Sequence, residues 1–313
     1  MKINPVSIIG GGPAGLAAAL QLTRYEIPTL LFEQYRLGGL LWNANLVENY
    51  PGFPEGITGP ALVKIMIDQA VSGRVKIIQQ EVLNLSFNGD HFQVMTSNRV
   101  YLSHSIVIAT GTKPKTLRDL TIPEALHQKV YYEIYPLLSL VGKQIMIVGG
   151  GDAAFDYALN LGKENYVIIV NRSTQVKCLP LLWQRVSASK NIAYRPNTTI
   201  TRVLPGDQDG MAVECSSPDG STILHADYLI GAIGRVPSLD FVSTELLEQS
   251  PALEKRGILH FVGDVKNDIF RQTAIACGDG IRAGMCIYQA LKESSSESDC
   301  LDRKRRHRHR LHR

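Results

Sequence analysis

Two glycine-rich turns carry the residue types and spacing that could bind a dinucleotide. The first, Gly10-x-Gly12-x-x-Gly15, follows an apolar run and opens an Ala- and Leu-rich stretch. The first glycine permits a tight turn, the second lets a pyrophosphate approach the backbone, and the third lets helix and strand pack closely. Glu33 ends the next apolar run and can accept hydrogen bonds from a ribose diol. The segment therefore predicts a dinucleotide-binding βαβ unit with phosphate at a helix N-terminus. The expected binding residues are Gly10, Gly12, Pro13, Ala14, Gly15 and Glu33.

The second turn, Gly149-x-Gly151-x-x-Ala154, has the same plan between two further apolar runs. Its second strand ends without an acid, at Asn171-Arg172-Ser173. An acid there would select NAD through the ribose 2′-hydroxyl, whereas cations suit the 2′-phosphate of NADP. The sequence therefore predicts a second nucleotide site that favours a phosphorylated ribose. Its expected binding residues are Gly149, Gly151, Asp152, Ala153, Arg172 and Lys177.

The spacing of the two units indicates that one domain is inserted into the other. The strands expected near residues 101–109 and 226–232 are each followed by a break, at 110–114 and 234–237. We therefore predict an α/β fold with two Rossmann-like domains. Residues 1–115 and 236–313 form the first, discontinuous domain, and residues 116–235 form the inserted NAD(P)-binding-like domain.

Composition limits the class of protein. The chain has 313 residues, of which 44% are hydrophobic and 20% charged, as in ordinary α/β proteins. No apolar run is long enough to span a membrane, and the first strand begins too early for a signal peptide, so a cytoplasmic location is expected. The last eleven residues, 303–313, hold seven Lys or Arg, and the rest of the chain has 26 basic and 29 acidic residues. The net charge of +4 thus arises from the C-terminal tail, about 292–313, which we expect to be disordered. The basic charge of a tail does not indicate a nucleic-acid-binding domain.

The five cysteines form neither a CxxC pair nor a metal-ligand spacing, so we expect no metal site and no disulfide framework. Cys277 precedes a helix expected to start near Gly278, where the helix dipole would stabilise a thiolate. It is therefore a candidate catalytic residue, and Cys300 could reach it. The alternative is a small residue packed at a helix start.

Several blocks beyond the first turn together resemble the low-molecular-weight thioredoxin reductase family, over nearly the whole chain to about Leu291. The blocks are Gly38-Gly39, Glu48-Asn49-Tyr50-Pro51-Gly52, Ala109-Thr110-Gly111, Gly263-Asp264, Arg271-Gln272 and Gly278-Asp279-Gly280. The resemblance implies that the first site binds FAD and that Asp264 hydrogen-bonds the ribityl chain. It also implies that Asn49 and the Gly38-Gly39 turn lie against the flavin. The helix expected near Gly278 would point its positive end at the flavin and favour the anionic reduced form.

The redox dithiol of that family is missing. By the resemblance, its two cysteines would fall on Tyr132 and Tyr135, and a phenol cannot form the mixed disulfide of thiol–disulfide exchange. The segment 130–137 more closely resembles thioredoxin reductase-like ferredoxin/flavodoxin–NADP reductases, which lack the dithiol. Arg271-Gln272, however, has the thioredoxin reductase form. Tyr132 and Tyr135 either face the flavin or pack between the domains.

The second site departs from the NADP-binding members, which carry His-Arg-Arg-x-x-x-Arg at this place. The chain keeps Arg172, has Ser173 for the middle Arg, and has Lys177 for the last. Because Lys lacks the bidentate fork of Arg, the phosphate clamp should be weaker. Three interpretations stay open: NADPH binds loosely, the site holds another nucleotide such as a second FAD, or it binds nothing tightly.

These features predict an FAD-dependent oxidoreductase that passes electrons between NADPH and a protein carrier such as ferredoxin or flavodoxin. The family resemblance implies a homodimer. One alternative is an atypical disulfide reductase that uses relocated cysteines, with thioredoxin as its partner. Another is a non-enzymatic flavoprotein redox sensor.

Overall fold

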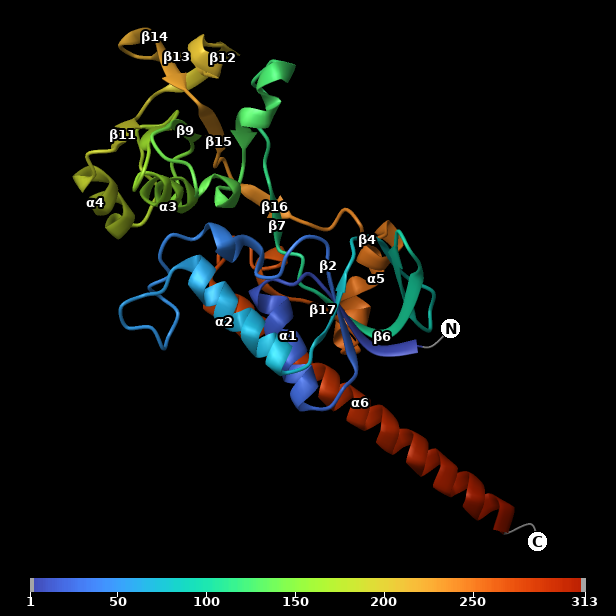
Figure 1. Cartoon of the computed structure of the whole chain (residues 1–313). Helices are drawn as coiled ribbons and strands as arrows, with labels where there is room; N and C mark the ends of the chain where they lie inside the picture. Colours follow the sequence, from blue (N-terminus) through green and yellow to red (C-terminus); the bar gives the residue numbers. More distant parts are fainter. Residues whose placement is uncertain (1–2, 311–313) are drawn as a thin grey trace.

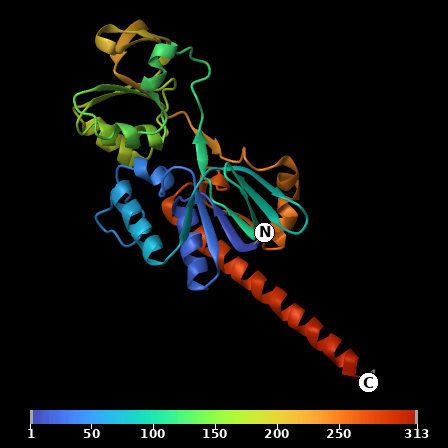
Figure 2. The same cartoon turned by 45° about the vertical axis from the view of Figure 1, so that its right-hand side comes forward.

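The computed structural model describes the backbone of residues 3–310 and the side chains of residues 3–207 and 209–293. Its described part contains two main sheets, joined through a narrow connection (Figure 1). Helix α6 runs away from the unit that holds the second sheet, as the turned view also shows (Figure 2). Among the described residues, no helix combines the length and apolar character that a membrane crossing needs.

The first sheet has seven strands, in the order β3-β2-β1-β6-β5-β4 with β17 also paired to β6. Strands β1, β2, β3, β6 and β17 run parallel, and β4 and β5 form an antiparallel extension. The central strands are buried on both faces, one packed on α1, α2 and α6 and the other on α5 and the β4–β5 hairpin. The strand bounds are β1 Ile3–Ile9, β2 Thr29–Glu33, β3 Lys76–Gln79, β4 Val82–Phe87, β5 Phe92–Thr96, β6 Val100–Ile108 and β17 Leu259–Phe261.

Helices α1 and α6 pack closely beside this sheet. A Cβ atom added at Gly280 of α6 would lie 2.1 Å from the carbonyl oxygen of Ala14 in α1. At the far end of α1, the rings of Tyr25 and Tyr288 stack at 4.1 Å. The N-terminal turn of α1 therefore lies against the second turn of α6. The helical segments of this unit are α1 Pro13–Arg24, η1 Gly39–Asn43, α2 Gly59–Ser72, α5 Thr244–Lys255, η5 Gly263–Val265 and α6 Thr273–Arg310.

The second sheet has five parallel strands in the order β11-β10-β9-β15-β8. A three-stranded antiparallel sheet, β12-β13-β14, lies beyond it. The strands are β8 Val130–Tyr131, β9 Gln144–Val148, β10 Tyr166–Val170, β11 Ile192–Arg195, β12 Thr199–Pro205, β13 Met211–Ser217, β14 Gly220–Ala226 and β15 Tyr228–Gly231. The helical segments are η2 Glu124–Lys129, η3 Tyr135–Leu137, α3 Asp152–Leu161, α4 Pro180–Ala188 and η4 Asp207–Asp209.

The two units are joined by a pair of short antiparallel strands, β7 Thr112–Pro114 and β16 Arg235–Pro237. These strands coincide with the two breaks expected from the sequence. The strands of the first sheet precede β7 or follow β16 in the sequence. The strands of the second sheet lie between β7 and β16 in the sequence. The expected α/β fold with two Rossmann-like units is therefore confirmed, and the boundaries at 115/116 and 235/236 stay a prediction.

The C-terminal helix differs from the sequence-based expectation. Helix α6 begins at Thr273 rather than near Gly278, so Gly278 and Gly280 lie inside it. The helix continues to Arg310, where disorder was expected from about residue 292. Because side chains from residue 294 onward lie outside the described part, the expected disorder of the tail stays a prediction.

Side chains of one unit hold backbone groups of the other. The Oδ1 of Asn43, at the end of η1, accepts hydrogen bonds from the N–H groups of Ile134 and Tyr135, both at 2.9 Å. Asn43 is almost fully buried. Nearby, the guanidinium of Arg185 in α4 donates two hydrogen bonds to Glu48 and holds the pKa of that carboxyl below its usual range. The segment before η3 is therefore fixed against the first unit.

Candidate functional site

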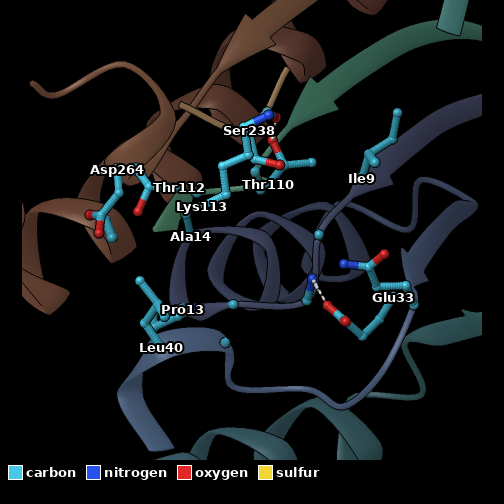
Figure 3. Close-up of a pocket in the computed structure, with 18 of the residues that line it drawn as sticks. Ile9, Pro13, Ala14, Glu33, Leu40, Thr110, Thr112, Lys113, Ser238 and Asp264 are labelled. Carbon is cyan, nitrogen blue, oxygen red and sulfur yellow. Dashed lines mark hydrogen bonds between the residues drawn. The ribbon is translucent and has the colours of Figure 1, made fainter. Parts of the chain in front are cut away.

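A cavity of about 630 Å³ lies at the carboxyl edge of the first sheet (Figure 3). Its volume is within the range of sites that bind cofactors. One wall is the first glycine turn with the end of β2, and the facing wall includes residues 109–114 and Asp264. Residues 271–273, at the start of α6, close one end. Ligands of open parallel sheets bind at this edge.

The three glycines of the first turn meet the geometry expected of them. Gly10 has a φ of +103°, and a Cβ there would lie 2.4 Å from the carbonyl oxygen of Ala109. A Cβ at Gly15 would lie 1.9 Å from the carbonyl oxygen of Gly10. A Cβ at Gly12 would meet nothing within 4 Å, because it would point into open space. The turn leads into α1, which has Pro13 in its first turn and whose free N–H groups suit a phosphate.

Glu33 lies at one end of the cavity (Figure 3). Its Oε2 accepts a hydrogen bond of 2.8 Å from the N–H of Gly11, and its Oε1 accepts one of 3.0 Å from the N–H of Tyr35. The carboxylate is thereby held at the position from which a ribose diol is bound in this kind of unit.

Asp264 and Arg271 lie at the opposite end. Burial raises the pKa of the Asp264 carboxyl, and the nearby charges of Arg271 and Arg235 partly offset this effect. The Nε of Arg271 is buried and has no hydrogen-bond partner among the described residues. A buried donor without a partner is costly, so it suits a ligand acceptor. With the phosphate cradle and Glu33, these residues fit a dinucleotide the size of FAD.

The other residues expected to bind FAD divide into two groups. Pro13, Ala14, Gly39, Ala109, Thr110, Gly111 and Gln272 line the cavity with those described above. Gly15, Gly38, Asn49 and Gly263 are not among its lining residues. Asn49 donates a hydrogen bond of 2.8 Å to Gln272, so it reaches the cavity wall only through that side chain.

Some cavity residues were missed by sequence reasoning. Among them are Thr112 and Lys113 of β7, Arg235 of β16, and Glu133. The positions of Thr112, Lys113 and Arg235 depend on the pairing of β7 with β16, which are far apart in the sequence. In the sequence, the signal for this pairing was the similar break after each of two expected strands, at 110–114 and at 234–237.

Tyr132 and Tyr135 both pack against protein groups. The hydroxyl of Tyr132 accepts a hydrogen bond of 3.0 Å from the N–H of Leu117. The ring of Tyr135 lies 5.0 Å from that of Trp42, and the guanidinium of Arg36 lies 3.9 Å from its centroid. Neither tyrosine is among the described residues that line the cavity, whereas Glu133 between them is. Tyr135 thus packs between the units, and contact of either ring with a flavin stays a prediction.

Cys277 lies within α6 and not at its start, which corrects the expected position. Its buried thiol donates a hydrogen bond of 3.8 Å to the carbonyl oxygen of Pro13 and accepts one of 3.9 Å from the hydroxyl of Tyr50. Burial raises the pKa of this thiol. It therefore lacks the thiolate character expected at a helix start. Cys300 lies outside the residues whose side chains are described.

The second glycine turn makes the same backbone hydrogen bond to its neighbouring strand as the first turn does. The N–H of Gly149 donates to the carbonyl oxygen of Val170, as that of Gly10 donates to Phe32. Asn171 therefore stands where Glu33 stands in the first unit. Its amide nitrogen donates to the hydroxyl of Tyr194 at 3.0 Å and to the carbonyl oxygen of Gln175 at 3.2 Å.

The remaining residues of the second turn surround an open position. A Cβ at Gly151 would meet nothing within 4 Å. Asp152 and Ala153 begin α3, and the Asp152 carboxylate accepts a hydrogen bond of 2.8 Å from the N–H of Leu179. Arg172 and Lys177 are exposed beside the turn. The site thus has an amide and two cations where an acid would select an unphosphorylated ribose.

The fold and the two turns define a protein with two dinucleotide-binding units. It belongs to the pyridine nucleotide-disulphide oxidoreductase family, whose model matches residues 4–286. FAD and a nicotinamide nucleotide are typical of this family.

Similar proteins include several named thioredoxin reductases. The chain is 32% identical to NADPH-dependent thioredoxin reductase 3 of Arabidopsis thaliana, over 94% of its own length and 59% of that protein. It is 28% identical to thioredoxin reductase of Chlamydia pneumoniae, over 89% of its own length and 96% of that protein. The crystal structure of Lactococcus lactis thioredoxin reductase has a TM-score of 0.83 at 27% identity, covering 93% of this chain and 99% of that one.

Proposed function

We propose that the chain is an FAD-dependent oxidoreductase that passes electrons between NADPH and a protein carrier such as ferredoxin or flavodoxin. The observation that carries the proposal is the pairing of a complete dinucleotide cradle with a sequence that has no CxxC. Without a CxxC pair beside the flavin, the usual thiol–disulfide relay is missing, and single-electron transfer to a carrier is an outlet that needs no dithiol.

The residues of the cavity have separate tasks in this proposal. The N-terminus of α1 holds the pyrophosphate, Glu33 holds a ribose, and Asp264 with Arg271 binds the other half of the dinucleotide. FAD supplies the hydride and electron chemistry when bound, and the protein positions it. No side chain needs to form a covalent intermediate.

The second turn supports NADPH as the donor. Asn171 presents no negative charge to a 2′-phosphate, and Arg172 and Lys177 are exposed nearby. We propose residues 116–235 as the unit that binds it, and a homodimer in the cytoplasm as the working form. A second FAD in this site is the alternative occupant.

An anaerobic titration tests the proposal. The flavin absorbance of the purified full chain is recorded on adding NADPH, NADH or reduced ferredoxin, and flavins per chain are counted. Bleaching by NADPH with a single flavin per chain is expected. Two flavins per chain would assign the second turn to FAD. A flavin that no donor bleaches would indicate a redox sensor.

The names of the relatives favour disulfide reduction as the second candidate. In that case relocated cysteines would pass electrons to thioredoxin. The buried thiol of Cys277 and its raised pKa argue against this. Cys277→Ser and Cys300→Ser separate the two candidates, because unchanged turnover with every acceptor eliminates the disulfide mechanism.

A further inference from the structure

Tyr135 packs against the loop that lies on the first glycine turn. The loop, residues 34–40, follows β2 in the first unit, whereas Tyr135 begins η3 of the second unit. The guanidinium of Arg36 lies 3.9 Å from the centroid of the Tyr135 ring, within the range of a cation–π contact. The ring of Trp42 meets the same tyrosine at 5.0 Å between centroids. One aromatic side chain of the second unit therefore contacts both the loop and the helical turn that follows it.

The position of Tyr135 is fixed by the backbone around it. Its N–H group and that of Ile134 donate to the Oδ1 of Asn43, both at 2.9 Å. Trp42, the neighbour of Asn43, donates a hydrogen bond of 2.7 Å from its indole nitrogen to the carbonyl oxygen of Leu37. The tyrosine is thus held on the loop by bonds that do not involve its ring. A substitution of the ring can therefore leave these bonds in place.

The loop lies directly on the turn expected to bind phosphate. The N–H of Gly38 donates a hydrogen bond of 2.8 Å to the carbonyl oxygen of Gly11. A Cβ atom added at Gly39 would lie 3.3 Å from the Cα of Gly12, the residue just before α1. Arg36 precedes these contacts in the loop and lines the cavity. Its charge therefore lies on the side of the cavity where the N-terminus of α1 would hold a pyrophosphate.

Arg36 differs from the other cations of the cavity. Among the described residues, the cationic side chains that line it are Arg36, Lys113, Arg235 and Arg271. Two of them are already ion-paired, Lys113 with Asp240 and Arg235 with Glu133. Arg271 lies at the opposite end, near Asp264. Within the described part of the chain, the guanidinium of Arg36 has neither an ion pair nor a hydrogen bond, and it stacks on Tyr135 instead. It is therefore the cation beside the phosphate turn that is left for a ligand anion.

We infer that Arg36 supplies a cation to the pyrophosphate of FAD and that Tyr135 of the second unit holds it in place. A guanidinium can donate two parallel hydrogen bonds to phosphate oxygens, so its orientation matters as well as its charge. Stacking on a fixed ring orders the arginine before the ligand arrives, which lowers the entropy cost of binding. Tyr135 is a positioning residue, because it acts through Arg36. The inference rests on the proposed function, because it requires FAD in the first cavity.

The test is equilibrium binding of FAD to the full chain after removal of its cofactor, followed by flavin fluorescence. Arg36→Gln should bind FAD about tenfold more weakly, and its dissociation constant should depend less on salt concentration. Tyr135→Leu removes the ring and keeps the backbone bonds to Asn43, so it should bind FAD about threefold more weakly. Tyr135→Phe keeps the ring and should bind FAD as the wild type does. Wild-type affinity and salt dependence in Arg36→Gln would overturn the inference.

A double variant separates positioning from packing. If Tyr135 acts through Arg36, Tyr135→Leu should weaken FAD binding in the wild-type background and add nothing in the Arg36→Gln background. An equal loss in both backgrounds would show that the ring acts by packing alone and would overturn the role of Tyr135. Arg99→Gln is the matched control, because Arg99 lies 4.3 Å from the ring centroid of Tyr101 and does not line the cavity. It should leave FAD affinity and its salt dependence unchanged.

The same measurements separate this inference from the proposed function. Circular dichroism and thermal unfolding check that each variant is folded. If Tyr135→Leu does not fold, Arg36→Gln still decides, because its side chain is exposed. Failure of NADPH to bleach the flavin would refute the proposed donor alone, since equilibrium binding of FAD does not use it. A wild-type chain that binds no FAD would refute both proposals.

Discussion

The backbone N–H of Asn45 donates a hydrogen bond of 2.9 Å to the Oδ2 of Asp156, across the boundary between the two units. Asp156 lies in α3 and is mostly buried, which raises the pKa of its carboxyl to about 6. The bond from Asn45 and the charge of Lys163 offset only part of that burial. A contact between the units therefore titrates close to physiological pH.

Replacement of Asp156 by Asn should stabilise the protein at neutral pH. The folded-state pKa is raised from 3.8, so the stability linked to this group is present below pH 3.8 and lost as the pH rises through about 6. Asp156→Asn keeps an acceptor for Asn45 and should raise the free energy of unfolding by about 1–3 kcal/mol above pH ~7. Near pH ~4 the two proteins should unfold alike.

Urea unfolding at both pH values measures this difference. Asp119→Asn, an exposed acid of the second unit, is the control and should change neither value. A gain of the same size at both pH values would show that burial of the charge is not its cause.

Two glycine substitutions should separate cofactor binding from folding. In Gly12→Ala the new Cβ stands in open space where a phosphate would approach, so the chain should fold and bind FAD at least about tenfold more weakly. In Gly15→Ala the Cβ would lie 1.9 Å from a backbone oxygen, so soluble yield should fall instead. Flavin absorbance and FAD titration of the purified proteins measure both. A Gly12→Ala protein with wild-type FAD affinity would contradict the assignment of the cradle.

Removal of the Asn43 side chain should loosen the contact between the units. Asn43→Ala leaves the buried N–H of Ile134 and the partly buried N–H of Tyr135 without an acceptor, which should cost about 1–4 kcal/mol. Asn88→Ala is a matched control, because its Oδ1 also accepts from two N–H groups, those of Asp90 and His91, but on an exposed loop. Thermal unfolding compares them. Equal losses of stability in Asn43→Ala and Asn88→Ala would contradict the view that burial of these hydrogen bonds makes Asn43 important.

The second turn should discriminate between NADPH and NADH through charge. Arg172→Ala should weaken NADPH binding by about tenfold and leave NADH unchanged, because only the 2′-phosphate requires the cation. Asn171→Glu should shift preference further toward NADH. Arg202→Ala, in the exposed sheet edge of β12, should alter neither. The apparent affinity in anaerobic flavin bleaching measures each variant, and parallel loss of both nucleotides would refute this account.

The sequence predicts the βαβ units well, because their signals are local. Strand β10, Tyr166–Val170, is one of the two apolar runs that flank the second glycine turn, and α3 begins directly after that turn. Apolar runs, glycine turns and helix periodicity each lie within one short segment. Glu33 and its bond to Gly11 follow from the same local pattern.

The errors and omissions concern contacts between distant segments. The start of α6 was misplaced because Gly278 and Gly280 suggest a turn, whereas Gly280 is required by close packing on Ala14. Arg235 reaches the cavity through pairing of strands more than a hundred residues apart, as its bond to Thr112 shows (|i−j| = 123). No local pattern reports such a pairing.

The strand pair β7 and β16 has an evolutionary consequence. Pro237 pairs with Thr112, so the chain enters and leaves the second unit at neighbouring points. Insertion at adjacent ends leaves a host fold intact. Because both ends of the second unit meet at this one strand pair, an insertion within that unit leaves the strand order of the first sheet unchanged.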